Sequence, residues 1–101
     1  MNDPMLLANR LKELAKLAEQ ANTAFEKAAV YAATRSIQAE FDAVEEDFDS
    51  YTLEKVLYAC THICAAVGYD ITNGHNSSQH IVWALGSISS LITQLKSCPE
   101  A

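Results

Sequence analysis

Residues 56–95 decide the fold: they read VLYACTHICAAVGYDITNGHNSSQHIVWALGSISSLITQL, and Asp70 is the only Asp, Glu, Lys or Arg among them. The apolar residues on each side of the polar middle recur at spacings of three and four, which is typical of two amphipathic helices joined by a turn. A helix at the surface of a domain usually carries charged residues on its outer face. Because this stretch lacks them, we expect its outer faces to be covered by the rest of the chain, by a second copy or by a partner.

Capping residues set the limits of these two helices. We expect the first helix to begin at Thr52, whose hydroxyl can cap it, and to end at Gly68. A polar turn over 72–78 follows, and Ser77 or Ser78 caps the second helix. The apolar face of the first helix comprises Leu53, Val56, Leu57, Cys60, Ile63, Cys64 and Val67. That of the second comprises Ile81, Leu85, Ile88, Ile92 and Leu95.

The first 48 residues predict a long helical arm. Asp3 followed by Pro4 is a helix start, with a capping acceptor before a proline at the first helical position. A heptad stripe then runs on without Gly or Pro, through Leu7, Leu11, Leu14, Ala18, Ala21, Phe25, Ala28 and Ala32. Alanine-rich stripes often complete their burial by pairing. We therefore predict a homodimer that self-associates through Leu7, Leu11, Leu14 and Phe25.

A second apolar stripe, offset in phase from the first, occupies the rest of the arm. Its members recur at helical spacing: Val30, Thr34, Ile37, Phe41, Val44 and Phe48. Either one helix with a twisting stripe or a break near Thr34–Ser36 accounts for the change of phase. No segment alternates as a strand does, so the fold class is all-α. We predict one domain over 1–101, with a helical arm at 1–48 and an antiparallel helical hairpin at 49–101.

The outer face of the last helix is the first candidate binding surface. With Ile81 on the buried side, Trp83 falls on the opposite side at 100° per residue. Small or uncharged side chains share that side: Gly86, Ser87, Ser90 and Gln94. Small residues let a second helix approach closely and Trp is enriched in interface hot spots, so we predict that these residues bind a partner. The alternative is that Trp83 packs under the N-terminal helix of its own chain.

An acidic cluster before the hairpin is the second candidate surface. Six acidic residues lie within ten positions without a basic one: Glu40, Asp42, Glu45, Glu46, Asp47 and Asp49. Phe41 and Phe48 are interleaved with them. We predict that these two aromatics and Glu45 contact a basic partner surface, with the charges steering association. The alternative is an ordinary solvated face behind a core stripe.

Reactive side chains form no recognisable catalytic or metal-binding motif. Cys60, His62 and Cys64 are close in sequence, but on a helix His62 points away from the two cysteines, so the three cannot ligate one ion. We expect both cysteines in the core, and His75 and His80 at the surface or capping a helix. The chain lacks glycine-rich phosphate loops, nucleophile elbows and paired catalytic carboxylates. We predict that the protein is not an enzyme and needs no cofactor or metal.

The charge of the chain argues against some classes of partner. The 101 residues carry a formal net charge of −6, with five basic and four acidic side chains in residues 1–35 and nine acidic and two basic ones in residues 36–101. Phosphate-rich partners attract Lys and Arg, so we expect neither nucleic acid nor an anionic membrane as partner. The N-terminus lacks the features of a secretory signal, and the three cysteines form no disulfide pattern, which predicts a cytoplasmic protein.

From Phe48 onward the chain resembles a family of small pseudomonad proteins of unknown function that share a helical hairpin. Their pattern has an aromatic before the first helix, a Leu-x-x-x-Leu/Ala stripe, a polar turn and a Trp-Ala pair that opens a helix with Leu or Ile at helical spacing. In this chain the matching elements are Phe48, Leu53, Leu57, Cys60, the 72–78 turn, Trp83-Ala84, Ile88 and Leu91. The resemblance covers about half of the chain. The family usually has more charge in its second helix, and the lack of it here suggests a specialised surface.

The resemblance implies a function as well as a hairpin. We expect the family to include a quorum-sensing anti-activator, which implies a homodimer that occupies the dimerisation surface of a LuxR-type receptor. The sequence therefore predicts a regulatory protein that sequesters a partner by helix packing, with a transcription regulator as the favoured partner. Two other functions stay open: a self-assembling structural or secretion-related helical protein, and an acidic immunity protein or antitoxin that binds a basic toxin.

Overall fold

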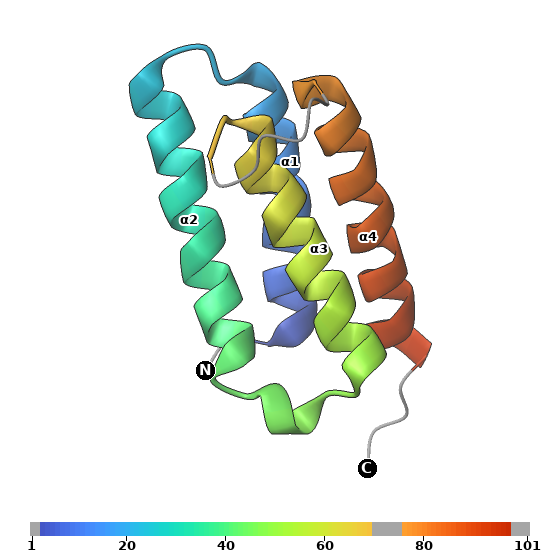
Figure 1. Cartoon of the computed structure of the whole chain (residues 1–101). Helices are drawn as coiled ribbons and strands as arrows, with labels where there is room; N and C mark the ends of the chain where they lie inside the picture. Colours follow the sequence, from blue (N-terminus) through green and yellow to red (C-terminus); the bar gives the residue numbers. More distant parts are fainter. Residues whose placement is uncertain (1–2, 70–75, 98–101) are drawn as a thin grey trace.

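The computed structural model describes residues 3–69 and 76–97, which form four α-helices and one short 3₁₀ helix (Figure 1). The α-helices are α1 (Pro4–Gln20), α2 (Ala24–Asp42), α3 (Ser50–Ala66) and α4 (Ser77–Ser97). The 3₁₀ helix η1 (Glu45–Asp47) lies between α2 and α3. No strand occurs within these residues, and the predicted all-α class is confirmed.

The four helices form an up-and-down bundle in which successive helices are antiparallel (Figure 1). The most extensive pair is α3 with α4, and α1 packs against all three other helices. In this arrangement α2 and α4 occupy opposite corners of the bundle (Figure 1). The predicted C-terminal hairpin is present as α3 and α4, and the N-terminal arm is a pair of helices.

The predicted continuous stripe over residues 7–32 is wrong, because the chain leaves the helix between α1 and α2. Ala21 is in an extended conformation, and a capping box then starts α2. The backbone N–H of Glu26 donates to Thr23 Oγ1 (3.0 Å), and the backbone N–H of Thr23 donates to Glu26 Oε1 (2.9 Å). The pattern Thr-x-x-Glu at 23–26 is the sequence signal for this break, and the regular heptad spacing concealed it.

This break explains the change of phase between the two apolar stripes, because α2 no longer has to continue the face of α1. The buried residues of α2 are four members of the second stripe: Val30, Thr34, Ile37 and Phe41. The three members of the first stripe that lie in α2 are exposed: Phe25, Ala28 and Ala32. Residues 34–36 are helical, so the alternative of a break at that point does not hold.

Two capping residues of the hairpin differ from the predicted ones. Asp49, rather than Thr52, caps α3, and its Oδ1 accepts from the backbone N–H of Thr52 (2.8 Å). Asn76, rather than a serine, caps α4, and its Oδ1 accepts from the backbone N–H of Gln79 (2.8 Å). The hydroxyl of Ser77 instead donates to a carbonyl oxygen at the end of α3 (2.8 Å), so it joins the two helices.

The turn after α3 depends on glycine, as predicted. Gly68 has a φ of 89°, which L residues with a side chain rarely adopt. Its N–H donates to the carbonyl of Ala65 (3.0 Å), and the N–H of Tyr69 donates to that of Cys64 (2.9 Å), which is a Schellman motif. The Tyr69 ring then stacks on Tyr31 of α2, with centroids 4.4 Å apart, and this contact fixes the end of α3 against α2.

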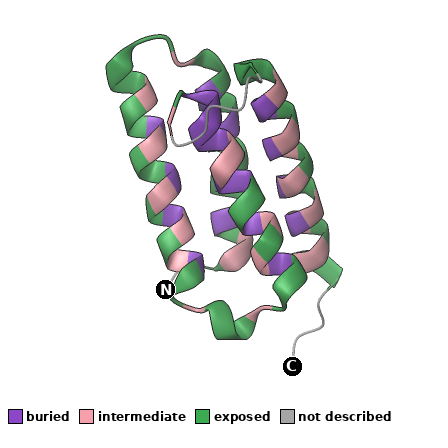
Figure 2. Ribbon diagram, in the orientation of Figure 1, coloured by how far each residue is buried: buried purple, intermediate pink, exposed green. Residues whose placement is uncertain are grey.

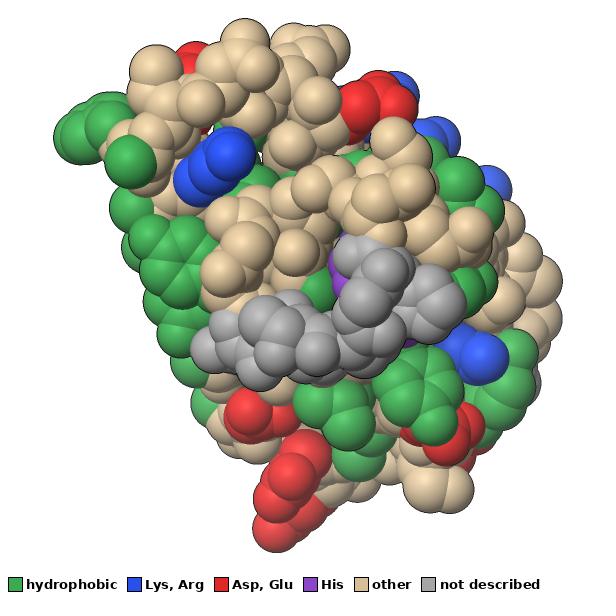
Figure 3. Space-filling view, turned by 45° about the horizontal axis from the view of Figure 1, so that its top comes forward, with side chains coloured by type: hydrophobic (Ala, Val, Ile, Leu, Met, Phe, Trp, Pro, Cys, Tyr) green, Lys and Arg blue, Asp and Glu red, His purple; other side chains and the backbone are tan. Residues whose placement is uncertain are grey.

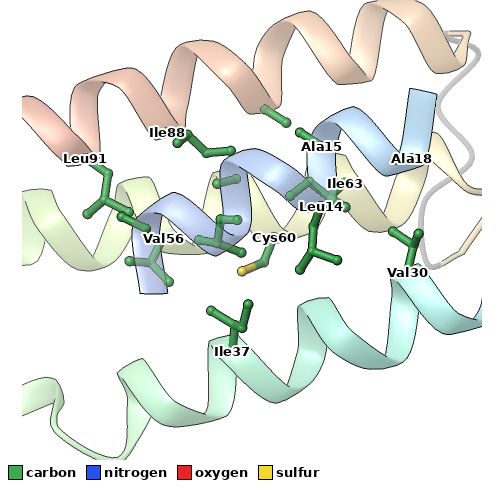
Figure 4. Close-up of a cluster of buried hydrophobic side chains, with 14 of the residues drawn as sticks. Leu14, Ala15, Ala18, Val30, Ile37, Val56, Cys60, Ile63, Ile88 and Leu91 are labelled. Atoms are coloured by element: carbon green, nitrogen blue, oxygen red, sulfur yellow. The ribbon is translucent and has the colours of Figure 1, made fainter. Parts of the chain in front are cut away.

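The core lies where the inward faces of the four helices meet (Figure 2). All four helices contribute to it (Figure 4), through residues that include Leu14, Val30, Ile37, Val56, Cys60, Ile63, Ile88 and Leu91. Cys60 and Cys64 have no exposed surface, and neither forms a disulfide bond. The prediction that both cysteines are core residues is confirmed.

Candidate functional site

Trp83 packs against its own chain, on the side of α4 that faces α3. Its ring centroid lies 5.2 Å from that of His62 in α3 and 5.6 Å from that of His80 in α4. The indole is half-buried, so part of it stays accessible. One side of Trp83 therefore packs within its own chain, as the alternative interpretation predicts. The helix that covers it is α3 rather than the N-terminal helix.

Two contacts fix the register between α3 and α4. At one end the His62 ring meets Trp83, and at the other end Gln94 Nε2 donates to Asp49 Oδ2 (3.5 Å). Residues at spacings of three and four between these contacts lie in two facing lines. The α3 line is Tyr51, Lys55, Tyr58 and His62, and the α4 line is Trp83, Ser87, Ser90 and Gln94. We call these two lines the α3–α4 seam.

The α4 line is uncharged and partly covered by α3, and its two middle residues, Ser87 and Ser90, are small. Ser87, Ser90 and Gln94 are half-buried, like Trp83. Gly86 lies outside the seam, is exposed, and a Cβ at this position would meet nothing within 4 Å. Packing within the chain therefore accounts for much of the charge-poor face that the sequence assigned to a partner.

The exposed aromatic surface of the seam comes from α3, and the sequence analysis missed it. Tyr51 is 46% exposed and Tyr58 is 42% exposed. Lys55 lies between them, with Nζ 5.1 Å from the Tyr51 ring centroid and 5.9 Å from that of Tyr58. Contacts of this kind orient both rings. The spacing of Tyr51, Lys55, Tyr58 and His62 is the signal that places them on one side of a helix.

Glu54 further restrains Tyr58. The Tyr58 hydroxyl donates to Glu54 Oε1 (3.1 Å). This hydrogen bond and the charge of Glu54 raise the pKa of Tyr58, because removing the proton would place two negative charges together. The ring is therefore held in one orientation with its hydroxyl protonated. A side chain that is ordered before binding loses little entropy when a partner arrives.

A pair of histidines lies at the Trp83 end of the seam. His62 Nδ1 and His80 Nδ1 are 3.0 Å apart, with ring centroids 5.3 Å apart. Two imidazole nitrogens at this distance share one proton, so one ring donates to the other. His80 is buried, and the expectation that it lies at the surface or caps a helix is wrong. His75 lies outside the described residues.

The aromatic residues of the acidic cluster belong to the core. Phe41 has no exposed surface and Phe48 is half-buried, with their ring centroids 5.8 Å apart. The prediction that Phe41 contacts a partner is therefore wrong, because the side chain completes the interior of the bundle. Glu45, Glu46 and Asp47 are exposed on η1, so the charges of the cluster do face solvent.

Asp49 connects the acidic cluster to the seam. Hydrogen bonds from the side chain and the backbone of Thr52 lower the pKa of Asp49 and keep its carboxylate ionised. One oxygen caps α3 and the other accepts from Gln94. Negative charge is thereby fixed at the Tyr51 end of the seam, next to exposed aromatic surface.

Cys60 is buried and has no reactive character. Burial, reinforced by Cys64, raises the pKa of Cys60 to about 12. A thiol with such a pKa is not a nucleophile at neutral pH. Within residues 3–69 and 76–97, no group of three or more His, Cys, Asp or Glu side chains is arranged to hold a metal ion.

Three of the four residues predicted to mediate self-association are buried inside a single chain. Leu7 is 1% exposed, Leu11 0% and Leu14 8%. They pack in the bundle core, so they cannot form a seam between two intact copies, and this part of the prediction is wrong. Phe25 is 83% exposed and is available to a second copy.

Comparison with protein-family models, with curated proteins and with solved structures found no match for this chain. No helix among the described residues is long and apolar enough to cross a membrane. Function is therefore inferred from the α3–α4 seam and from the distribution of charge. Figure 3, with the α1–α2 connection turned toward the viewer, shows mostly hydrophobic and uncharged surface with separate small groups of acidic and basic side chains.

Proposed function

We propose that this protein is a regulatory interaction module that sequesters a partner protein, and that the α3–α4 seam is the surface that binds it. The observation that carries the proposal is the pair of exposed, oriented tyrosines, Tyr51 and Tyr58, on the same seam as the half-buried Trp83. Tyrosine and tryptophan are enriched in interface hot spots because they bury a large area with few rotatable bonds. Glu54 and Lys55 order the tyrosines before the partner arrives, which lowers the entropic cost of binding.

The charges around the seam indicate the chemistry of the partner surface. Asp49 lies at one end of the seam, and the exposed acidic residues of η1 precede it in the chain. A partner surface with apolar pockets for aromatic rings, flanked by Lys or Arg, would complement this arrangement. The acidic residues would accelerate association with such a surface, while the aromatic contacts would slow dissociation.

We propose a transcription regulator of the LuxR type as the specific partner. Support comes from the resemblance, from Phe48 onward, to the pseudomonad hairpin family, in which we place the quorum-sensing anti-activator QslA. That protein binds a LuxR-type receptor and blocks both its dimerisation and its DNA binding. A rigid helical hairpin with an aromatic seam suits the same mode of action. This mode of action requires a cytoplasmic protein, and two buried cysteines without a disulfide bond, Cys60 and Cys64, fit that location.

The test compares wild type with a Tyr51→Ser/Tyr58→Ser variant as bait for capture from native lysate. Leu57→Ser is the matched control, because Leu57 is 49% exposed on α3 but points about 140° away from His62 at 100° per residue. We expect the tyrosine variant to lose the partner and the control to retain it. The captured protein, once purified, should bind the tyrosine variant at least about tenfold more weakly. Equal binding by all three baits would contradict the proposal.

The tyrosines test the surface more cleanly than Trp83 does. Trp83→Asp would place a carboxylate against His62 and His80, so we expect it to disturb the packing of α3 on α4 as well as any partner contact. Loss of binding by that variant would not separate a binding role from a structural one. Tyr51 and Tyr58 are exposed, do not belong to the buried core, and have their described contacts within α3.

A second candidate function is an acidic immunity protein or antitoxin, and the exposed Glu45, Glu46 and Asp47 favour it. Recovery of a basic nuclease or toxin from the lysate would support this function over anti-activation. Changing these three residues to Gln, Gln and Asn should then slow association strongly at low ionic strength. An unchanged association rate would reject it.

Self-association remains part of the proposal, with Phe25 as the residue that can mediate it. Phe25 and Leu17 are both exposed near the junction of α1 and α2 and line one hollow. Phe25→Asp should convert a dimer into a monomer in sedimentation velocity, without loss of helix content. A dimer that survives this change must use another surface, and recovery of the protein with no partner but itself would favour the structural self-assembly function.

A further inference from the structure

The groove between α1 and α4 lies on the side of α4 opposite the α3–α4 seam. Its floor is apolar and is formed by Leu85, Ile88 and Ile92. Ile88 is buried, while Leu85 and Ile92 are half-exposed and present apolar surface to the groove. Ser89 and Thr93 form the rim on α4 without any charge.

Basic side chains gather at this groove in a protein that is otherwise acidic. Lys12 and Lys16 line it from α1, one helical turn apart, and Lys96 lines it from the last turn of α4. These are three of the seven Lys and Arg residues of a chain whose formal net charge is −6. No acidic residue is among the described side chains that line the groove. The groove therefore selects a ligand that is both apolar and negatively charged.

The length of the groove corresponds to about three turns of a helix. The hollow encloses about 440 Å³ between two neighbouring antiparallel helices. It follows α4 from Leu85 to Lys96, which is about 16 Å at 1.5 Å per residue, or about three turns of a third helix. The lysines are spread along this length rather than gathered at one end. A single anionic head group can reach only the neighbouring Lys12 and Lys16, whereas a helix with several carboxylates can also engage Lys96 from α4.

We propose that the α1–α4 groove docks an acidic amphipathic helix of a partner protein. The apolar side chains of that helix, at spacings of three and four, pack on Leu85, Ile88 and Ile92, as in other helix-in-groove complexes. Its Glu and Asp side chains lie over Lys12, Lys16 and Lys96. This surface is opposite in charge to the η1 end of the seam and lies on another side of α4, so the proposal does not rest on the sequestering function. One protein can thereby hold two partners of opposite charge.

The first experiment measures the binding of labelled model peptides to the full chain by fluorescence anisotropy. The probe is an amphipathic helix of about four turns with leucine along one face and glutamate on both flanks. The comparison peptides carry glutamine or lysine in place of every glutamate and keep the leucines. We expect saturable binding of the glutamate peptide, binding about tenfold weaker for the glutamine peptide, and none for the lysine peptide. Binding of the glutamate peptide should weaken as salt is added.

Charge-reversal variants locate the site. Lys12→Glu/Lys16→Glu should weaken binding of the glutamate peptide by about tenfold or more. The matched control is Arg10→Glu/Lys27→Glu, which has the same net charge; Arg10 lies on α1 but lines the hollow between α1 and α2. A third variant, Ser89→Trp, fills the groove without changing the charge and should also block the peptide. Circular dichroism verifies that all variants keep their helices.

Four results would overturn the proposal. Equal binding of the glutamate and glutamine peptides would show that the groove does not select for negative charge. An equal loss of peptide affinity in the Lys12→Glu/Lys16→Glu variant and in its control would show that the peptide does not bind at the groove. Displacement of a bound dye by dodecanoate, without peptide binding, would make the groove a site for small amphiphiles. If the wild-type protein is a dimer and the Lys12→Glu/Lys16→Glu variant is a monomer, the groove is occupied by a second copy of the chain. Because none of these variants changes the tyrosines of the seam, failure here leaves the sequestering function to be judged separately.

Discussion

Phe41 and Phe25 provide the most direct test of the fold, because they are the same residue type on the same helix in opposite environments. Phe41 has no exposed surface and packs against Phe48, whereas Phe25 is 83% exposed. The sequence patterns predict both at interfaces, Phe41 with a partner and Phe25 with a second copy. The fold assigns only Phe25 to the surface. Replacing each by alanine separates the two assignments.

The expected cost of Phe41→Ala follows from its complete burial. Truncating a buried phenylalanine lowers the free energy of unfolding by about 3–5 kcal/mol, through lost transfer energy and the cavity that remains. A domain of this size has a total free energy of unfolding of about 5–15 kcal/mol, so the loss is a large fraction of it. Since each kcal/mol shifts the midpoint of thermal unfolding by about 4–8 °C, Phe41→Ala should lower Tm by about 12 °C or more.

Phe25→Ala is the matched control. Both substitutions lie in α2 and gain the same helix propensity, so this contribution cancels between them. A surface substitution of this kind changes the free energy of unfolding by no more than about 0.5 kcal/mol. Both values are measured by urea titration followed by circular dichroism, at a protein concentration where wild type and variant have the same oligomeric state. A cost for Phe25→Ala equal to that of Phe41→Ala, or a cost for Phe41→Ala below about 1 kcal/mol, would refute the assignment of faces in α2.

Three further predictions concern caps and thiols. Thr23→Ala removes one half of the capping box and should lower the free energy of unfolding by about 1 kcal/mol. The loss is measured from the shift of the urea midpoint, and an unchanged midpoint would mean that the capping box does not stabilise the start of α2. Asp49→Ala should lower stability at neutral pH. Because the pKa of Asp49 is lowered in the folded state, the difference from wild type should shrink as the pH falls below about 4, and a difference independent of pH would exclude the ionised cap. In a Cys98→Ser background, Cys60 and Cys64 should not react with a thiol reagent at pH 8 until the protein is unfolded; rapid reaction of the native protein would contradict their burial.

Much of the fold could be predicted from the sequence, because its signals are local. A cap, a turn or an amphipathic face depends on residues within about four positions of one another. Asp3 before Pro4, the left-handed Gly68 and the stripe from Val30 to Phe41 all act in the fold as they read in the sequence. The break between α1 and α2 is also a local signal, the Thr-x-x-Glu pattern at 23–26. It was missed because a heptad spacing persists across it.

The candidate site was less predictable, because it consists of contacts between helices. Helical phase showed correctly that Trp83 does not share the face of Ile81, but it could not show that His62 of α3 covers the indole. The sequence does not single out the tyrosines of the seam, because no local pattern distinguishes a tyrosine at the α3–α4 seam from one that is only exposed to solvent. Phe41 was misassigned because acidic neighbours on both sides suggested a surface.

The sequence by itself determined the all-α class, the cap at Asp3, the turn at Gly68 and the uneven charge, because those depend on neighbours along the chain and on composition. Only the tertiary structure decided which faces meet. Leu7, Leu11 and Leu14 are buried in the core of one chain, His62 of α3 lies against Trp83 of α4, and lysines from the first and last helices line one groove. Such pairings depend on the rotation and register of each helix against the others. These are set by packing all four apolar faces together at once, and no short segment contains that information.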